Sequence, residues 1–220
     1  MSNTNRYPNR QSTESTNGLA SSKRSPGAQG GDIDNERTAS SSSSSSPPKS
    51  DSNSFIGKDE LLVYFKRQLK YFEEWHLKQD WLAFHNHHYD WWMFPIDEIS
   101  SRDATFQLPR DVILDLKENR EFISDLRRGV YLMVSSWGWD IEHGRCFEKL
   151  DDKQKWSYWP VRLYKAGKCM WLFEQMDYYQ SLKKLAYYIK DERKEKLDFF
   201  SHTKKAKANV IEQWNEMERR

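Results

Sequence analysis

Three histidines lie within four positions of one another, at His85, His87 and His88. Imidazole nitrogen is a common ligand of zinc, and residues three apart share a helix face, so His85 and His88 would point the same way on a helix. The remaining ligands of a metal site could come from His143, Cys146 or Cys169. The alternative is structural, with His87 hydrogen-bonded in a buried turn and the other two partly exposed. The absence of His-Glu-x-x-His and Cys-x-x-Cys spacings favours the structural role.

A second candidate is Arg162, which follows Pro160 at an expected helix start. A buried guanidinium there could clamp a carboxylate or phosphate of a ligand, because arginine presents a planar fork of donors. It could also form a structural ion pair within the chain. The carboxylates considered for such a pair are those of Asp90, Asp97 and Glu98. Both roles stay open, and the structural one is favoured because arginine suits buried ion pairs.

Aromatic side chains are dense, since all ten tryptophans and all eleven phenylalanines lie from Phe55 onward. Most of them should form the core, while a subset could line a groove for a peptide or a partner helix. Residues 156–160, Trp-Ser-Tyr-Trp-Pro, fall in an expected loop or helix start. Exposed aromatic side chains at that place would favour a binding role.

Signatures of catalysis are absent from the sequence. There is no nucleophile elbow and no glycine-rich loop of the kind that binds phosphate. Acidic pairs such as Asp151-Asp152 and Glu73-Glu74 fit solvated surfaces better than general acid–base catalysis. We therefore expect a protein that is not an enzyme and that carries no cofactor.

The candidate residues must be positioned by residues 55–220, because residues 1–54 have the composition of a disordered tail. That tail is rich in serine, with an unbroken run from Ser40 to Ser46, and has almost no large apolar residues. Such a segment cannot bury enough apolar surface to offset the entropy lost on ordering. The remaining chain is long enough to form one hydrophobic core.

The pattern after Phe55 is helical almost throughout, since glycine and proline are rare and apolar residues recur at helical spacing. We expect an all-α fold, a compact bundle of about six to seven helices. The expected helices cover residues 58–75, 78–94, 110–117, 120–137, 160–176, 178–190 and 192–217. The second should be central and mostly buried, because its aromatic residues fall on more than one face. The last, within the C-terminal segment 192–220, is amphipathic and could pack on the bundle or extend from it.

Composition argues against several classes of function. The 35 Lys and Arg residues are nearly balanced by 33 Asp and Glu residues, so no basic excess indicates a nucleic-acid partner. The sequence has no apolar run of about 18 residues, so no transmembrane helix is expected. The N-terminus lacks the apolar stretch of a secretory signal. Two cysteines without framework spacing favour free thiols in a reducing compartment. We expect an intracellular protein, in the cytoplasm, the nucleus or both.

Residues 87–95 resemble the signature of the opioid growth factor receptor conserved domain, a family with a His-x-Tyr-x-x-Trp-x-Phe-Pro pattern at the end of a helix. The matching positions are His87, Tyr89, Trp92, Phe94 and Pro95. Two further segments agree in order. Leu132–Gly138 is similar to the end of the family's next helix, and Val161–Lys165 resembles its arginine-containing helix, with lysine as the last residue. Residues 158–160 depart from the family pattern, so the chain resembles a divergent member.

The resemblance implies a helical domain without transmembrane segments, a signalling-type role, and binding of a peptide or protein partner. Named animal members of the family are associated with the nucleus and with an enkephalin peptide. The residues nominated for ligand binding are His87, Tyr89, Trp92, Arg162 and Lys165. Two alternatives remain. One is a metal-binding protein or enzyme that uses His85, His87 and His88, and the other is a helical protein that self-assembles through its C-terminal helix.

Overall fold

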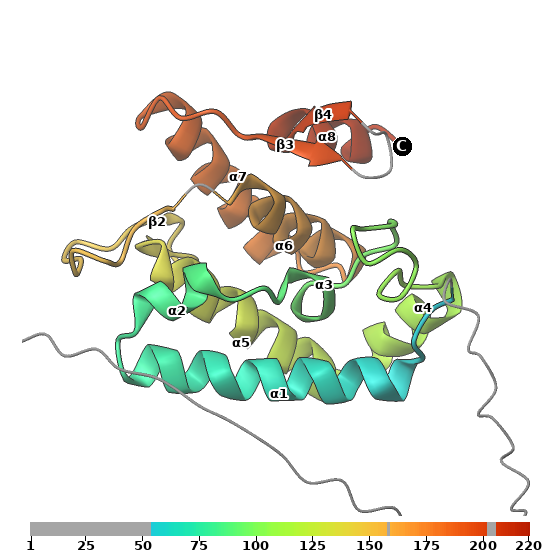
Figure 1. Ribbon diagram of the computed structural model, residues 1–220. Coiled ribbons are helices and arrows are strands. Elements are labelled where there is room, and N and C mark those ends of the chain that lie inside the picture. Colours follow the sequence, from blue (N-terminus) through green and yellow to red (C-terminus); the bar gives the residue numbers. More distant parts are fainter. Residues whose placement is uncertain (1–53, 158, 202–205) are drawn as a thin grey trace, which may run out of the picture. The chain divides into compact units, whose positions relative to one another are not determined.

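Eight helices and two short hairpins make up the part of the chain that the structure, a computed structural model, describes: residues 54–157, 159–201 and 206–220 (Figure 1). The helices are α1 (Lys58–Leu77), α2 (Trp81–Asn86), α3 (Asp90–Met93), α4 (Arg110–Glu118), α5 (Arg120–Ser136), α6 (Pro160–Leu172), α7 (Met176–Asp191) and α8 (Val210–Glu218). The strands are β1 (Trp139–Asp140), β2 (Arg145–Cys146), β3 (Asp198–Ser201) and β4 (Ala206–Asn209). The serine-rich tail expected over residues 1–54 lies, apart from Ser54, outside the described residues.

Helix dominates the described residues, as the sequence predicts, but two hairpins make the all-α expectation incomplete. The first hairpin pairs β1 with β2 in the polar connection after α5. Gly138 ends that helix with φ +81°, as predicted, and Gly144 turns the chain with φ +62°. The second hairpin pairs β3 with β4 in a stretch that was expected to be helical.

Helix α1 packs on α5 (Figure 1). Leu61, Phe65 and Phe72 share one face of α1, and all three are fully buried. Glu73 of α1 accepts hydrogen bonds from Arg128 of α5 at 2.6 and 2.8 Å. Both side chains are partly exposed, so this pair orients the two helices more than it stabilises them. Among the described helices, none combines the length and the apolar character needed to cross a lipid bilayer.

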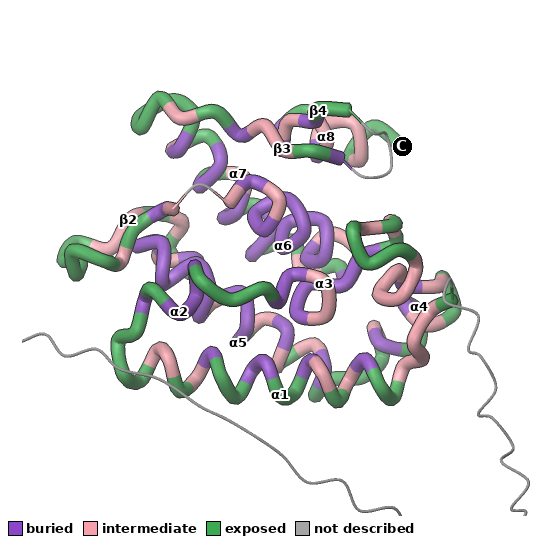
Figure 2. The backbone as a smooth tube through the Cα atoms, viewed as in Figure 1, coloured by how far each residue is buried: buried purple, intermediate pink, exposed green. Residues whose placement is uncertain are grey.

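Helix α6 is the most buried of the described helices, since nearly every residue from Pro160 to Met170 is buried (Figure 2). It contacts α3, α7, α8 and β3. Pro160 occupies the first helical position, as predicted. A backbone N–H at that position would have no partner within the helix, so the lack of one in proline costs no hydrogen bond. Gly167 is required by packing, because Trp214 of α8 places Cζ2 2.1 Å from the position of a β-carbon.

The single helix expected over residues 78–94 is two helices, α2 and α3. Asp80 begins α2 by accepting a hydrogen bond from the backbone N–H of Ala83 at 3.2 Å. The helix ends at His87, whose backbone is extended with φ −103° and ψ 147°. Local and distant side chains both bind the carbonyl groups at its end, and the hydroxyl of Tyr89 donates to the carbonyl oxygen of Phe84 at 2.8 Å. Arg162 of α6 donates to carbonyl groups at the end of α2 that the next helical turn would otherwise use.

The prediction of one helix over residues 192–217 is wrong, because this segment contains the strands β3 and β4 before the short helix α8. Lys194 adopts φ +56°, which turns the chain away from the path of α7. Asn209 caps α8 by accepting a hydrogen bond from a first-turn N–H at 3.1 Å. The apolar face of α8 packs on the bundle, where Trp214 Nε1 donates to the carbonyl oxygen of Tyr164 at 3.2 Å. That face is therefore covered within the chain.

Candidate functional site

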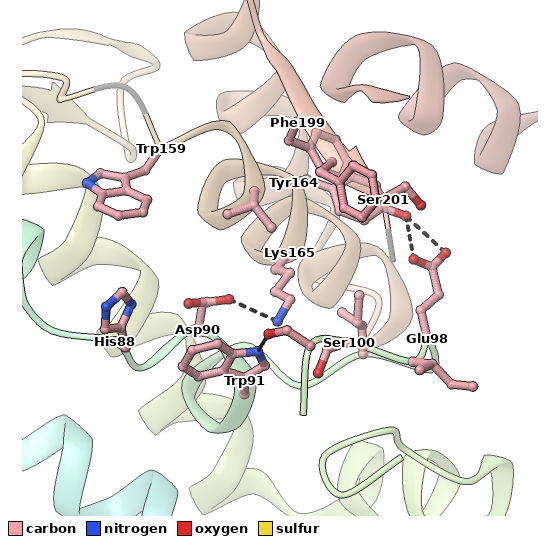
Figure 3. Close-up of a pocket in the computed structure, with 15 residues that line it drawn as sticks. His88, Asp90, Trp91, Glu98, Ser100, Trp159, Tyr164, Lys165, Phe199 and Ser201 are labelled. Carbon is pink, nitrogen blue, oxygen red and sulfur yellow. Dashed lines mark hydrogen bonds and ion pairs between the residues drawn. The ribbon is translucent and has the colours of Figure 1, made fainter. Parts of the chain in front are cut away.

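A cavity of about 150 Å³ lies where α3, the loop that follows it, the start of α6 and strand β3 meet (Figure 3). Its walls are mainly apolar, and five of its residues are the aromatic Trp91, Trp159, Tyr164, Phe199 and Phe200. The rings of Tyr164 and Phe199 stack with their centroids 4.9 Å apart. Concave apolar surfaces with a few polar groups are typical of ligand sites. We therefore take this cavity as the candidate site and call it the aromatic pocket.

A buried ion pair forms part of the wall of the aromatic pocket. Lys165 Nζ on α6 lies 2.9 Å from Asp90 Oδ2 on α3, and the two side chains are 7% and 8% exposed. The ammonium group also lies 5.5 Å from the centroid of the Trp91 ring. Burial lowers the pKa of Lys165, and the negative charge of Asp90 opposes this shift only in part. The pair links α3 to α6 across the pocket.

Glu98, from the loop after α3, is the second acidic residue of the pocket. Its carboxylate accepts a hydrogen bond from the hydroxyl of Tyr164, at 3.0 and 3.1 Å to the two oxygens, and one from Lys168 Nζ at 2.6 Å. Lys168 also lies 2.6 Å from Asp97 Oδ1. Burial and then the charge of Glu98 raise the pKa of Tyr164, so its phenol stays protonated and donates. Both carboxylates of the pocket are therefore paired with lysines of α6.

Cations of the chain itself lie against both tryptophan rings of the pocket. Trp91 is oriented by Ser101, whose Oγ accepts a hydrogen bond from the indole Nε1 at 3.1 Å. The guanidinium of Arg102 lies 4.8 Å from the centroid of the Trp91 ring. The guanidinium of Arg162 lies 4.1 Å from the centroid of the Trp159 ring. The pocket thus contains few sites at which a further positive charge would be stabilised.

Arg162 is paired with backbone carbonyl groups and not with a carboxylate. Its side chain is fully buried, and Nη1 and Nη2 donate to the carbonyl oxygens of Phe84 and His87, at 2.6 Å each. Carbonyl groups at a helix C-terminus carry partial negative charge, so the end of α2 compensates the guanidinium as a carboxylate would. The ion pair with Asp90 that was considered for Arg162 is made by Lys165 instead.

Of the five residues nominated for ligand binding, Lys165 alone lines the pocket. Tyr89 is fully buried, and its hydroxyl donates to a carbonyl oxygen of α2 at 2.8 Å. Trp92 faces α1, where its Nε1 donates to Gln68 Oε1 at 3.4 Å. His87, expected in a buried turn, is exposed, and its ring is hydrogen-bonded to a carbonyl oxygen of α2 at 2.9 Å. With Arg162, these residues hold α2 and α3 in position and do not border the cavity.

The three histidines do not share a metal site, because α2 ends between His85 and His88. His85 is buried, and its ring nitrogens have no hydrogen-bond partner within the described residues. Burial, followed by the charge of Arg162, lowers its pKa to about 4. His88 is exposed at the pocket, with its ring centroid 5.9 Å from that of Trp91. In the described part of the chain, no group of three or more His, Cys, Asp or Glu side chains could hold a metal ion.

Sequence reasoning found part of the pocket. It singled out Trp159 in the loop before α6, and this side chain is partly exposed at the cavity. It missed Asp90 as the partner of Lys165, although two charged residues within apolar helical segments are a signal for a buried pair. It missed Phe199, because the surrounding segment was expected to be helical. In comparisons with protein-family models, with curated proteins and with solved structures, the chain matches none.

Proposed function

We propose that the domain is a non-enzymatic binding module that holds a peptide or protein partner by one apolar side chain in the aromatic pocket. One observation carries the proposal: the cavity is apolar, while the charged side chains Asp90, Glu98 and Lys165 in its wall are already paired within the chain. A neutral group that enters the pocket leaves these pairs intact. A charged group would have to displace one of them or remain unpaired in an apolar setting, which is unfavourable.

The size of the pocket favours a side chain over a larger ligand. Pockets for drug-sized molecules have volumes of about 300–1,000 Å³, whereas an apolar cavity of about 150 Å³ holds one benzene ring. The aromatic pocket, at about 150 Å³, belongs to the second class. Protein interfaces are commonly anchored by a single aromatic or aliphatic side chain in such a pocket. We infer that the anchor is a phenylalanine, leucine or methionine side chain of the partner.

The charges around the pocket argue against a cationic anchor. Aromatic walls can bind an ammonium group, but the rings of Trp91 and Trp159 already contact guanidinium groups of Arg102 and Arg162. Peptide or protein binding is also the role that resemblance to the opioid growth factor receptor conserved domain implies. Metal chemistry and self-assembly through α8 are supported less well, because no donor cluster exists among the described residues and the apolar face of α8 is packed inward.

The proposal is tested by selecting peptides on the full chain and measuring where they bind. A displayed library of random peptides is enriched on the protein, and the enriched sequences are synthesised and titrated by calorimetry. We expect them to share one apolar anchor residue. Ile99 lies at the pocket and is 47% exposed, so Ile99→Trp should fill the entrance and weaken binding at least about tenfold.

A matched variant controls for the added tryptophan. Val63 on α1 is 55% exposed and does not line the pocket, so Val63→Trp should leave the affinity unchanged. Enriched peptides that bind Ile99→Trp as tightly as the parent would place the binding surface elsewhere. A library that yields no enriched sequence would remove the support for a peptide anchor.

A further inference from the structure

Lys165 places a primary amine in the wall of the aromatic pocket. The structure shows a carboxylate oxygen of Asp90 at 2.9 Å as the ion-pair partner of Nζ. Lys168, one turn later on α6, differs because its ammonium group contacts two carboxylates, those of Asp97 and Glu98. The amine of Lys165 therefore combines burial, an adjoining cavity and one carboxylate in direct contact, that of Asp90, which can accept a proton. The charge of Glu98 acts on the same amine without direct contact.

We propose that Lys165 reversibly captures small aldehydes with an apolar or aromatic body, by forming an imine inside the aromatic pocket. This goes beyond partner binding but rests on the proposed function in one respect, since both use the same cavity. The ring of the aldehyde would occupy the space between Trp91, Trp159 and Tyr164, and its carbonyl carbon would meet Nζ. The cavity holds one ring, so the class of ligand is limited to compounds of about the size of benzaldehyde.

The reaction needs no oxidant or reductant. The ammonium group of Lys165 gives one proton to Asp90, and the nitrogen lone pair forms a C–N bond with the carbonyl carbon as the C=O π electrons move to oxygen. Asp90 returns its proton to that oxygen, and a second N–H proton joins it as water leaves. Overall, the ammonium and the aldehyde give a protonated imine and one water molecule. The positive charge stays on nitrogen, so the ion pair with Asp90 is restored.

Burial supports this chemistry at neutral pH. Only the unprotonated amine attacks a carbonyl group, and a lysine at its ordinary pKa of about 10.4 is almost wholly protonated near pH 7. Burial lowers the pKa of Lys165 despite the neighbouring carboxylate, so a larger fraction of this amine is unprotonated. Lys78 on the surface, with a side chain 64% exposed, has no such environment and serves as an internal reference.

The test is reductive trapping of the full chain with benzaldehyde and cyanoborohydride near pH 7, followed by peptide mapping. We expect Lys165 to be labelled at least about tenfold faster than Lys78, because burial lowers the pKa of Lys165 and the pocket holds the aldehyde beside its amine. Excess benzyl alcohol, which fits the pocket but forms no imine, should slow labelling of Lys165 and leave Lys78 unchanged. Equal labelling of the two lysines, or labelling of Lys165 that benzyl alcohol does not slow, would overturn the proposal.

Two variants complete the design. Lys165→Met should lose the pocket label, whereas Lys183→Met, which removes a partly buried, ion-paired lysine of α7, should retain it. The wild-type mapping keeps the test decisive even if Lys165→Met folds poorly. Quenching of tryptophan fluorescence by benzyl alcohol separates the two proposals. Quenching without imine formation would support the pocket as a binding site and refute capture by Lys165. If neither quenching nor imine formation is seen, both proposals are refuted.

Discussion

Two buried glycines should differ in how strongly the same substitution changes the stability of the protein. Gly129 on α5 and Gly167 on α6 are both interior helix positions, where alanine is favoured by about 1 kcal/mol. A β-carbon at 129 would stand 1.9 Å from Met93 Cε, the end of a flexible thioether that can rotate away. A β-carbon at 167 would stand 2.1 and 2.5 Å from Cζ2 and Cε2 of Trp214. That indole is rigid and 1% exposed, so it cannot move without moving α8.

The magnitudes follow from these contacts. Overpacking a core costs about 1–3 kcal/mol, and displacing the indole also weakens its hydrogen bond to Tyr164, worth about 1 kcal/mol. After the gain in helix propensity, Gly167→Ala should lower the free energy of unfolding by about 2 kcal/mol. Gly129→Ala should change it by less than about 1 kcal/mol, because only a methionine rotamer changes.

Urea unfolding followed by circular dichroism measures both variants, provided that the slope m stays constant. The contact itself is tested in a Trp214→Leu background, where the indole is absent. There, Gly167→Ala should become neutral or stabilising, which gives a coupling energy of at least about 1.5 kcal/mol. A Gly167→Ala protein as stable as the parent, or an equal loss in both backgrounds, would refute the role assigned to Trp214.

Three further predictions concern buried ionisable side chains. Asp90→Leu should lower the free energy of unfolding in urea by about 3 kcal/mol, because it leaves the buried ammonium group of Lys165 without its ion-pair partner. Adding Lys165→Met should recover more than half of this loss. A loss below about 1 kcal/mol for Asp90→Leu would contradict the buried pair. Because His85 has a pKa lowered to about 4, the unfolded chain binds more protons between pH 4 and 6.5, so stability falls as pH falls through that range. Between pH 6.5 and 4, the free energy of unfolding of the wild type should fall relative to that of His85→Phe by at most about 1.4 kcal/mol per pH unit. Parallel curves of unfolding free energy against pH for the two proteins would exclude this linkage. Arg162→Met should speed amide exchange in α2 more than in α1, whereas equal protection in both proteins would deny that Arg162 caps α2.

Local patterns were sufficient where an element is determined by its own residues. The apolar stripe of α1 follows from side chains at helical spacing, and the start of α6 follows from Pro160. Gly138 was expected to end α5, and it does so with a positive φ. In each case, the decisive residue lies within the element or directly next to it.

Local patterns failed where a distant segment decides the structure. The apolar residues between Phe199 and Met217 have the spacing of a helix. Phe199 nevertheless lies in strand β3, and its side chain stacks on Tyr164 of α6. Such tertiary packing overrides helical periodicity in short segments. The aromatic pocket was predicted only in part, at Trp159 and Lys165, because its walls come from α3, a loop, α6 and β3 and no single segment contains its pattern.

The contact between Arg162 and the end of α2 has a consequence for the order of folding. Arg162 and the carbonyl group of His87 lie 75 positions apart in the chain. During synthesis, residues 81–94 are complete long before α6 exists, so the hydrogen bonds from Arg162 to the end of α2 can form only later. We expect this stretch to sample one continuous helix until α6 docks and its guanidinium binds the carbonyl groups. Asp90 and Trp91 should reach their final positions only then, so we expect the aromatic pocket to be assembled late in folding.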